Sequence, residues 1–400
     1  MKYLVLIANG LSDEPIAEKD NKTPLQLSQT PNLDFLAQKG STGSVYMVPE
    51  SLPAGNDVSY LSLLGLDPEQ HLAGVAAFEA ARLGVDLESD EIPLCCDFIS
   101  LQSSHNDLIM KDYTAGNLSD EDAGVFLSAL QEQVVDSNVR FHPGIGHHHL
   151  MILKSPPIEA PLTPPFELVG EGMRKFMPQD ESCKELVHII NQAQVILHNH
   201  PLNKQRQQNG SDTVNSIWLW GNGEARSLPL FFDKYKLQAS LISGSLLFQG
   251  MAKSAGIKVV PVAGATGSME THFKGKVDAA LKELEEQDVV YLHIAGAEEA
   301  SLHGNIDDKI LALEDFDNEV LRPLLQELEI RNDVKMLLTQ NHVCSVNLMK
   351  YKKDPVPFAV YPAKGEKGGA QHFDEQILET GSRHFKSGPE LMDAFFKEEL

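Results

Sequence analysis

Residues 51–68 read SLPAGNDVSYLSLLGLDP, a turn with proline and glycine followed by a mostly apolar run that ends at an Asp-Pro pair. This pattern predicts a tight turn at Gly55 that leads into a helix. Such turns often hold an anion or present a nucleophile in α/β enzymes, because free backbone N–H groups point outward there. The turn presents Asn56, whose amide cannot take a phosphoryl or acyl group as a hydroxyl or thiol can. The stretch therefore looks like a nucleophile loop without its nucleophile, and Asp57 is a typical acidic helix-start residue.

Outside this stretch, apolar strand-like runs alternate with helical patterns. The first run, Tyr3–Ile7, reads as a buried strand that ends in the turn Asn9-Gly10. Later strand candidates are Ala239–Ile242, Val259–Val262, Val289–Ile294, Val334–Leu338 and Val356–Tyr361, and helix candidates are Ser245–Ala255, Lys276–Glu286 and Asp307–Leu328. This alternation predicts an α/β fold with a mostly parallel sheet and helices on both faces. Ligands gather at the carboxyl ends of strands in such sheets, which makes Asn9 a candidate site residue.

The pattern of the chain changes between residues 88 and 235. This part contains the strand-like runs Leu94–Leu101, Leu150–Leu153 and Ser216–Trp220, helices near Ser119 and Glu181, a proline-rich loop at Ser155–Phe166 and a polar segment at His198–Asp212. We interpret 88–235 as an inserted, smaller α+β domain. Residues 1–87 and 236–400 then form one discontinuous core domain.

The composition excludes several classes of function. The 33 basic and 57 acidic residues give a net charge of −24, which argues against binding to nucleic acid or to an anionic membrane surface. No apolar run approaches the roughly 20 residues of a membrane span, and the N-terminal run reads as a strand rather than a secretion signal. The four cysteines show no CxxC spacing, so we expect reduced, mostly buried thiols in a cytoplasmic protein.

Several short motifs together resemble one known family. They are Lys2–Gly10, Lys22–Leu25, Thr30–Asn32, Val58–Pro68, His200–Asn203, Asn215–Gly221, Gly264–Gly267 and Asp354–Phe358. They are similar to the archaeal-type cofactor-independent phosphoglycerate mutases, which belong to the alkaline phosphatase superfamily. The resemblance runs from end to end, and the string NSIWLWG at Asn215–Gly221 is highly specific. It implies an alkaline-phosphatase-like core with an inserted cap domain.

The resemblance also implies a chemistry, in which a phosphorylated serine lies beside two divalent metals, usually Mn or Mg. The position of the serine is Asn56 in this chain. The positions that hold the metals in the family are Asn9, Asn56, Glu298, Leu302, Asn341, His342 and Tyr351. Only His342 is unchanged from the family pattern, and Glu298 is the one conservative replacement. The chain therefore departs from the family where the family's chemistry takes place.

Positions that the resemblance places near the substrate differ as well. The family's Gly-Arg-Gly-Pro falls on Gly74–Ala77, its Ser-Tyr-Arg-His falls on Gly146–His149, and another of its histidines falls on Asn117. Both lost arginines are residues that can bind a phosphate or carboxylate in a bidentate manner. The remaining candidates for a substrate pocket are Asp57, His148, His149, Asn203 and Arg206.

Elementary electrostatics predicts the effect of these replacements. Two divalent ions carry four positive charges, and hard cations prefer carboxylate oxygens. The altered set offers a single carboxylate, Glu298. Each carboxylate that is missing removes one attraction to the cations, which is worth about 4 kcal/mol near a protein surface. We therefore expect no metal and no other cofactor. Neutral amides in place of facing carboxylates suit a pocket that stays folded without metal.

Three alternatives would preserve a reactive site. Ser59 or Ser62 could act in place of Asn56, Glu298 could act together with His303, and His147–His149 could bind a soft metal. We favour structural roles in each case. Helical serines usually pack or cap, a spacing of five residues leaves the common helix face, and successive residues on a strand point in alternate directions.

The sequence thus leads to two hypotheses. The first is an inactive phosphoglycerate mutase homologue with a binding, regulatory or assembly role, and the second is an active mutase or related phosphotransferase with a rearranged site. A small phosphorylated ligand or a protein partner suits the first hypothesis. The sequence does not predict the oligomeric state.

Overall fold

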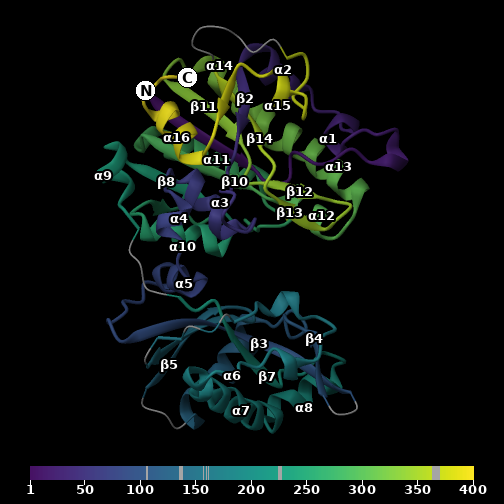
Figure 1. Ribbon diagram of the computed structural model, residues 1–400, viewed down its shortest axis with the longest axis vertical. Helices are drawn as coiled ribbons and strands as arrows, with labels where there is room; N and C mark the ends of the chain where they lie inside the picture. Colours follow the sequence, from purple (N-terminus) through teal and green to yellow (C-terminus); the bar gives the residue numbers. More distant parts are fainter. Residues whose placement is uncertain are drawn as a thin grey trace. The chain divides into compact units, whose positions relative to one another are not determined.

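The computed structural model describes all residues except 105–106, 135–137, 156, 159, 161, 224–227 and 363–369. The chain divides into two compact units, one formed by residues 1–72 and 227–400 and the other by residues 73–226 (Figure 1). The sequence pattern placed these limits at 87/88 and 235/236. The difference at the first limit comes from helix α5 (Val75–Leu83), whose Ala76 and Ala80 belong to a buried cluster of the second unit.

The first unit is built on an eight-stranded sheet. Its strands, in spatial order, are β15 (Arg383–Phe385), β2 (Ser41–Val45), β14 (Val356–Tyr361), β11 (Val334–Thr339), β1 (Lys2–Ala8), β10 (Val289–Ile294), β8 (Ala239–Ile242) and β9 (Lys258–Val259). Strand β14 is antiparallel to both of its neighbours, and the remaining pairings are parallel. The expected α/β class with a mostly parallel sheet is therefore confirmed.

Helices and a short hairpin complete this unit. The hairpin consists of β12 (Val343–Ser345) and β13 (Lys350–Lys352). The helices are α1 (Pro24–Leu27), α2 (Pro31–Lys39), α3 (Asn56–Leu63), α4 (Pro68–His71), α9 (Phe231–Tyr235), α10 (Leu246–Ser254), α11 (Phe273–Glu286), α12 (Gly296–Leu302), α13 (Ile306–Asp315), α14 (Arg322–Ile330), α15 (Ile377–Thr380) and α16 (Gly388–Phe396).

The expected helix Asp307–Leu328 is present but not uniform. A π-helical turn, Phe316–Leu321, separates α13 from α14. Pro323 lies in the first turn of α14, and because proline has no backbone N–H, a widened turn accommodates it. The π-helical turn also buries Asp317, whose carboxylate accepts a hydrogen bond from the backbone N of Leu33 at the start of α2 (2.8 Å).

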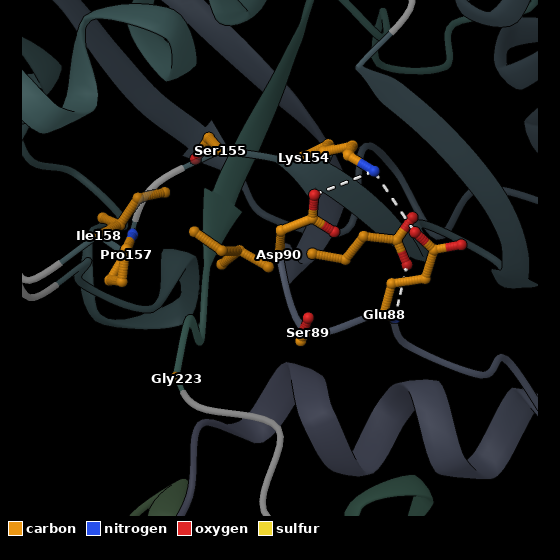
Figure 2. A pocket seen from close by; sticks show the side chains of 10 residues that line it. Glu88, Ser89, Asp90, Lys154, Ser155, Pro157, Ile158 and Gly223 are labelled. Atoms are coloured by element: carbon orange, nitrogen blue, oxygen red, sulfur yellow. Dashed lines mark hydrogen bonds and ion pairs between the residues drawn. The ribbon is translucent and has the colours of Figure 1, made fainter.

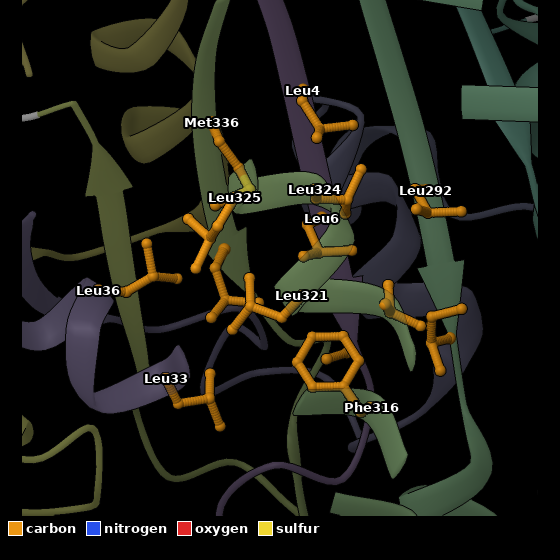
Figure 3. Packing of buried hydrophobic residues seen from close by; sticks show 14 of the residues in the cluster. Leu4, Leu6, Leu33, Leu36, Leu292, Phe316, Leu321, Leu324, Leu325 and Met336 are labelled. Atoms are coloured by element: carbon orange, nitrogen blue, oxygen red, sulfur yellow. The ribbon is translucent and has the colours of Figure 1, made fainter. Parts of the chain in front are cut away.

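The core of this unit lies between the sheet and the helices that cover one of its faces. Leu4 and Leu6 of β1 and Leu292 of β10 point toward Phe316 and Leu33 in the same cluster, and all five side chains are buried (Figure 3). Burying a leucine or phenylalanine side chain contributes about 1.5–3 kcal/mol. This packing fixes the positions of the strands whose carboxyl ends carry the candidate site.

The second unit is an α+β structure around an antiparallel sheet. Its strands are β3 (Glu91–Ser104), β4 (Asp107–Asp112), β5 (Val139–Ile145), β6 (His148–Lys154) and β7 (Ser216–Trp220). The long strand β3 pairs with β4, β6 and β7, and β6 pairs with β5. Besides α5, the helices are α6 (Asp120–Gln133), α7 (Lys184–His198) and α8 (Pro201–Gln208).

Helix α8 corrects the interpretation of His198–Asp212 as a merely polar segment. His200 is its N-cap and accepts a hydrogen bond from the backbone N of Leu202, and Pro201 occupies the first turn. The helix is polar, yet it buries Asn203 and Arg206 through hydrogen bonds rather than through an apolar stripe. A search for apolar helical periodicity cannot detect such a helix.

Two general expectations can be compared with the structure. All four cysteines are free and buried, as expected. Among the described helices, none combines the length and the apolar character needed to cross a lipid bilayer.

Candidate functional site

Six of the seven predicted metal-site positions share one hydrogen-bond network in the first unit, and the sixth is His342, which contacts Asn341. Asn9 follows β1, Asn56 is the first residue of α3, Glu298 lies in α12, Asn341 follows β11, and Tyr351 lies in β13. The parallel strands β1, β10 and β11 end at the same edge of the sheet, which brings the segments that follow them together. The structure thus gathers residues that lie far apart in the sequence.

Gly10 allows this close approach. Its φ of +84° is in the left-handed region, and a Cβ atom there would lie 2.4 Å from the backbone N of Glu298 and 2.5 Å from the carbonyl carbon of Ala297. Only glycine suits both the backbone angle and the lack of space. The turn after β1 therefore lies directly against α12.

The Glu298 carboxylate is the centre of the network. Asn9 Nδ2 donates to its Oε2 (2.6 Å) and Asn56 Nδ2 donates to its Oε1 (3.0 Å). Asn341 Nδ2 donates in turn to Asn56 Oδ1 (2.5 Å), and Asn56 Nδ2 lies 3.4 Å from the Tyr351 hydroxyl. Because each carboxylate oxygen already accepts an amide N–H, the buried charge is compensated by the protein's own donors.

Neighbouring groups are neutral. Burial, together with the Glu298 charge, raises the pKa of the Tyr60 and Tyr351 hydroxyls far above their usual value, so both keep their protons. Burial lowers the pKa of His342, whose Nε2 lies 3.2 Å from Asn341 Nδ2 and whose ring lies 4.1 Å from that of Tyr351. Tyr60, Tyr351 and His342 therefore add no charge to that of the Glu298 carboxylate.

Sequence reasoning missed a second layer of the site. Asn9 Nδ2 also lies 3.3 Å from the Tyr60 hydroxyl, which lies 3.4 Å from His293 Nε2. The other ring nitrogen of His293 is 2.8 Å from Ser243 Oγ. Burial, and then the charge of Lys276, lowers the pKa of His293 to about 3, so its ring is neutral. The sequence did contain one indication of this layer, because His293 lies near the carboxyl end of a mostly apolar strand.

The contacts and exposure of Ser59, Ser62 and His303 do not support the first two alternative reactive sites. Ser59 Oγ donates to the Gly55 carbonyl (2.9 Å) and Ser62 Oγ donates to the Met47 carbonyl (2.6 Å), and both serines are buried. His303 follows the end of α12 and is exposed, whereas Glu298 is 5% exposed.

Leu302 and Asp57 complete the predicted positions of the first unit. Leu302 lies one helical turn after Glu298 in α12 and is half-buried. Asp57 Oδ1 accepts the backbone N–H of Val58 (3.0 Å), as an acid in a first helical turn does, and burial raises the pKa of Asp57.

Two of the substrate-pocket candidates in the second unit have intramolecular partners. Asn203 Nδ2 donates to the carbonyls of Leu197 and Val214 (2.7 Å each), and its Oδ1 accepts the backbone N–H of Val214 (2.9 Å). Arg206 pairs with Asp122 (2.5 Å) and donates to the Ala115 carbonyl (2.8 Å). These contacts explain both residues without a ligand, and a role in a substrate pocket stays a prediction.

His148 and His149 occupy different environments. His148 Nδ1 lies 2.5 Å from Asp97 Oδ1, and Trp220 Nε1 donates to Asp97 Oδ2 (2.8 Å). Burial by itself would lower the pKa of His148, but the Asp97 carboxylate outweighs it and holds that pKa well above the usual value. Burial and the neighbouring His148 lower the pKa of His149 to about 4. His148 is thus a half-buried cation with a partner, and His149 is buried and neutral.

The second unit also contains a cavity of about 840 Å³. Figure 2 shows Lys154 pointing toward Asp90 and Glu88, with ion-pair distances of 3.0 and 3.4 Å, while Ile158 lies on another side. None of the predicted site residues lines this cavity. Lys154 pairs with two of the three carboxylates that line it, and Glu91 pairs with Arg140, so the cavity by itself indicates no ligand.

The comparisons with known proteins agree on one family. A family model described as 2,3-bisphosphoglycerate-independent phosphoglycerate mutase matches residues 37–203. A probable mutase of this type from Geobacter sulfurreducens is 35% identical over 394 residues, which cover 98% of this chain and 99% of that protein. The mutase of this type from Methanosarcina mazei is 34% identical over 400 residues, which cover 99% and 100%. The chain belongs to this family.

Solved structures show that the fold is shared. A Pyrococcus horikoshii protein aligns over 100% of this chain and 98% of its own with a TM-score of 0.80 and 23% identity. The cofactor-independent phosphoglycerate mutase from Thermoplasma acidophilum aligns over 100% of both chains with a TM-score of 0.63 and 24% identity. The resemblance to the mutase family that the motifs indicated is therefore confirmed.

The pair of metals that the resemblance to this mutase family implies does not fit the residues present. The donors that surround Glu298 are amide N–H groups, which point at the carboxylate where cations would have to lie. Within the residues that the structure describes, no group of three or more His, Cys, Asp or Glu side chains is arranged to hold a metal ion. No reaction step of this protein is therefore assigned to a metal.

Proposed function

We propose that this phosphoglycerate mutase homologue lacks the two-metal phosphoserine chemistry and has a binding, regulatory or assembly role. One observation carries the proposal. Both oxygens of Glu298, the only carboxylate among the seven positions, accept hydrogen bonds from Asn9 and Asn56. A metal-activated nucleophile requires oxygen ligands that are free to bind a cation, and each oxygen of this carboxylate already accepts a hydrogen bond from an amide of the protein.

The position of the nucleophile supports the same proposal. Asn56 donates to Glu298 and accepts from Asn341, so its side chain acts as a link between two other residues. An amide does not form a phosphoryl intermediate. The nearby hydroxyls of Ser59 and Ser62 donate to backbone carbonyls inside the protein.

A direct assay tests this proposal. Interconversion of 3- and 2-phosphoglycerate is followed by an enolase-coupled reaction in the presence of Mn²⁺ or Mg²⁺, with the Methanosarcina mazei relative measured beside it. We expect kcat/KM at least about 1,000-fold below that of the relative, because the charge stabilisation by metals and the nucleophile are both missing. A value within tenfold of the relative would contradict the proposal.

The alternative, an active mutase or phosphotransferase with a rearranged site, is favoured by the 35% identity to a probable mutase over nearly the whole chain. The two proposals differ in the effect of Asn56→Ala and Glu298→Gln on any activity found. In the alternative, at least one of these substitutions abolishes the activity. A trace activity that survives both comes from a contaminating enzyme.

We further propose a small phosphorylated ligand or a protein partner as the binding target, in the cytoplasm. The free, buried cysteines suit a reducing compartment, and the acidic composition argues against nucleic acid. Binding to the native state raises the midpoint of thermal unfolding. An unchanged midpoint at millimolar 3-phosphoglycerate would exclude this compound as the ligand and leave a protein partner.

A further inference from the structure

We infer that Asn9, Asn56 and Asn341 replace divalent cations as the structural brace of the first unit. The amides of Asn9 and Asn56 donate hydrogen bonds to the Glu298 carboxylate, and the Asn341 amide holds Asn56 in place. Because these amides carry no negative charge, the site excludes cations by charge rather than by shape. This inference concerns folding and cation exclusion. It holds whether or not the protein has a catalytic activity, so the mutase assay and the experiments below can fail independently.

The first step of the argument is the number of segments that the network joins. It connects the turn after β1, the start of α3, helix α12, the turn after β11 and, through Tyr351, the hairpin strand β13. Asn9 and Glu298 are 289 residues apart in the sequence, and Asn56 and Asn341 are 285 apart. These long-range contacts therefore join segments that lie far apart in the sequence.

The second step concerns charge. Glu298 is 5% exposed, and a buried carboxylate without donors is strongly disfavoured. Asn9 and Asn56 supply N–H groups at 2.6 and 3.0 Å, which is the geometry of strong hydrogen bonds to an ionised acceptor. The two amides therefore supply one hydrogen bond to each carboxylate oxygen without a cation, whereas Asn9 Oδ1 and His342 Nδ1 are buried without a hydrogen-bond partner among the described residues.

The third step distinguishes the charge of these side chains from their size and position. Hydrogen bonds connect Asn9 to Glu298, Glu298 to Asn56, and Asn56 to Asn341. The backbone therefore still directs these side chains to a common centre. Replacing amides by carboxylates of nearly equal size would create a cluster of facing negative charges, which is stable only when a cation lies between them.

The test is the double substitution Asn9→Asp with Asn341→Asp, measured by calorimetry in EDTA and in 1 mM Mn²⁺. In EDTA, we expect the unfolding midpoint to fall by about 5–15 °C, because uncompensated buried charges strongly destabilise folded proteins. With Mn²⁺, we expect at least half of this loss to be recovered and about one equivalent of metal to be bound. Wild type and the surface control Asn332→Asp should show neither effect.

Glu298→Gln provides the second, independent measurement. If the amides act as a brace for the carboxylate, its loss leaves one amide N–H facing another N–H, and the midpoint falls in EDTA. If Glu298 is only a tolerated buried charge, its neutralisation leaves the midpoint unchanged or raises it, which would overturn the inference.

The double variant is informative even if it does not fold in EDTA. Refolding that occurs only with Mn²⁺ supports the inference. If the double variant folds in neither condition, the unfolding midpoint of Glu298→Gln decides between the two outcomes described above. A double variant that is as stable as wild type in EDTA, or that folds but binds no Mn²⁺, would overturn the inference.

Discussion

Asn56 shows how one residue can occupy the position of a nucleophile and have a different role. Its amide donates to Glu298 and its carbonyl oxygen accepts from Asn341, so both ends of the side chain are used. A serine hydroxyl is too short to make both contacts. The residue is therefore part of a structural network, and its chemistry follows from its hydrogen-bond partners rather than from its place in the turn.

The carboxyl group of Glu375 makes the stability of the folded protein depend on pH, and this dependence can be measured. Burial raises the pKa of its carboxyl group to about 7, although its oxygens accept hydrogen bonds from the backbone N of Asp13 (3.0 Å) and from Thr23 Oγ1 (2.7 Å). The folded pKa lies above the unfolded value of 4.5. The folded state therefore binds the proton more tightly, and stability decreases as pH rises from 4.5 to 7.

Glu375→Gln removes this titration and keeps an acceptor for Asp13. We expect the variant to be more stable than wild type by about 1–2 kcal/mol at pH 8, with the difference declining toward pH 4.5. Urea unfolding at both pH values measures this difference. The exposed Glu379→Gln serves as the control, and a Glu375→Gln variant that is no more stable than wild type at pH 8 would contradict the assignment.

At the scale of elements, helix α8 shows stabilisation by polar groups. Asn203 joins the end of α7 to the segment before β7 by three hydrogen bonds to backbone groups of Leu197 and Val214. An alanine at this position would leave buried backbone groups without partners. The loss of these hydrogen bonds should therefore lower the stability of the second unit.

We expect Asn203→Ala to lower the free energy of unfolding by about 2–4 kcal/mol, whereas the exposed Gln205→Ala on the same helix should change it by less than about 0.5 kcal/mol. The two tryptophans of the sequence, Trp218 and Trp220, both lie in β7. Their fluorescence during urea unfolding therefore reports the second unit. Equal stability of the two variants would show that the hydrogen bonds of Asn203 do not stabilise the second unit.

The sequence predicts apolar elements better than polar ones. Strands Ala239–Ile242, Val289–Ile294 and Val356–Tyr361 agree residue for residue with β8, β10 and β14, because buried strands form continuous apolar runs. Helix α8 and the π-helical turn were missed, since one depends on polar contacts and the other on a local effect of Pro323.

The same limit applies to the candidate site. The resemblance to the mutase family identified seven positions as one set, and the structure places all of them except Leu302 in one network. The sequence does not show that the amide nitrogens face the carboxylate, because this orientation depends on partners from five separate segments. It also gave no role to Tyr60 and His293, whose contacts are visible only in three dimensions.

At the scale of the whole molecule, the chain has the fold that solved structures of similar proteins show. It matches named phosphoglycerate mutases along nearly its full length at 34–35% identity. The candidate site lies at the sheet edge where β1 and β11 end, in a network that carries one carboxylate and three amides. We propose that this fold is retained without bound metal ions.

Metal content tests this central claim most directly. The full-length protein is dialysed against Mn²⁺ and Mg²⁺, separated from loosely bound ions, and analysed by plasma mass spectrometry, with the Methanosarcina mazei relative treated in parallel. We predict less than about 0.1 equivalent of either metal per chain, because a neutral amide site binds hard dications weakly. A content close to two equivalents per chain would contradict the account and would require a metal centre built from other residues.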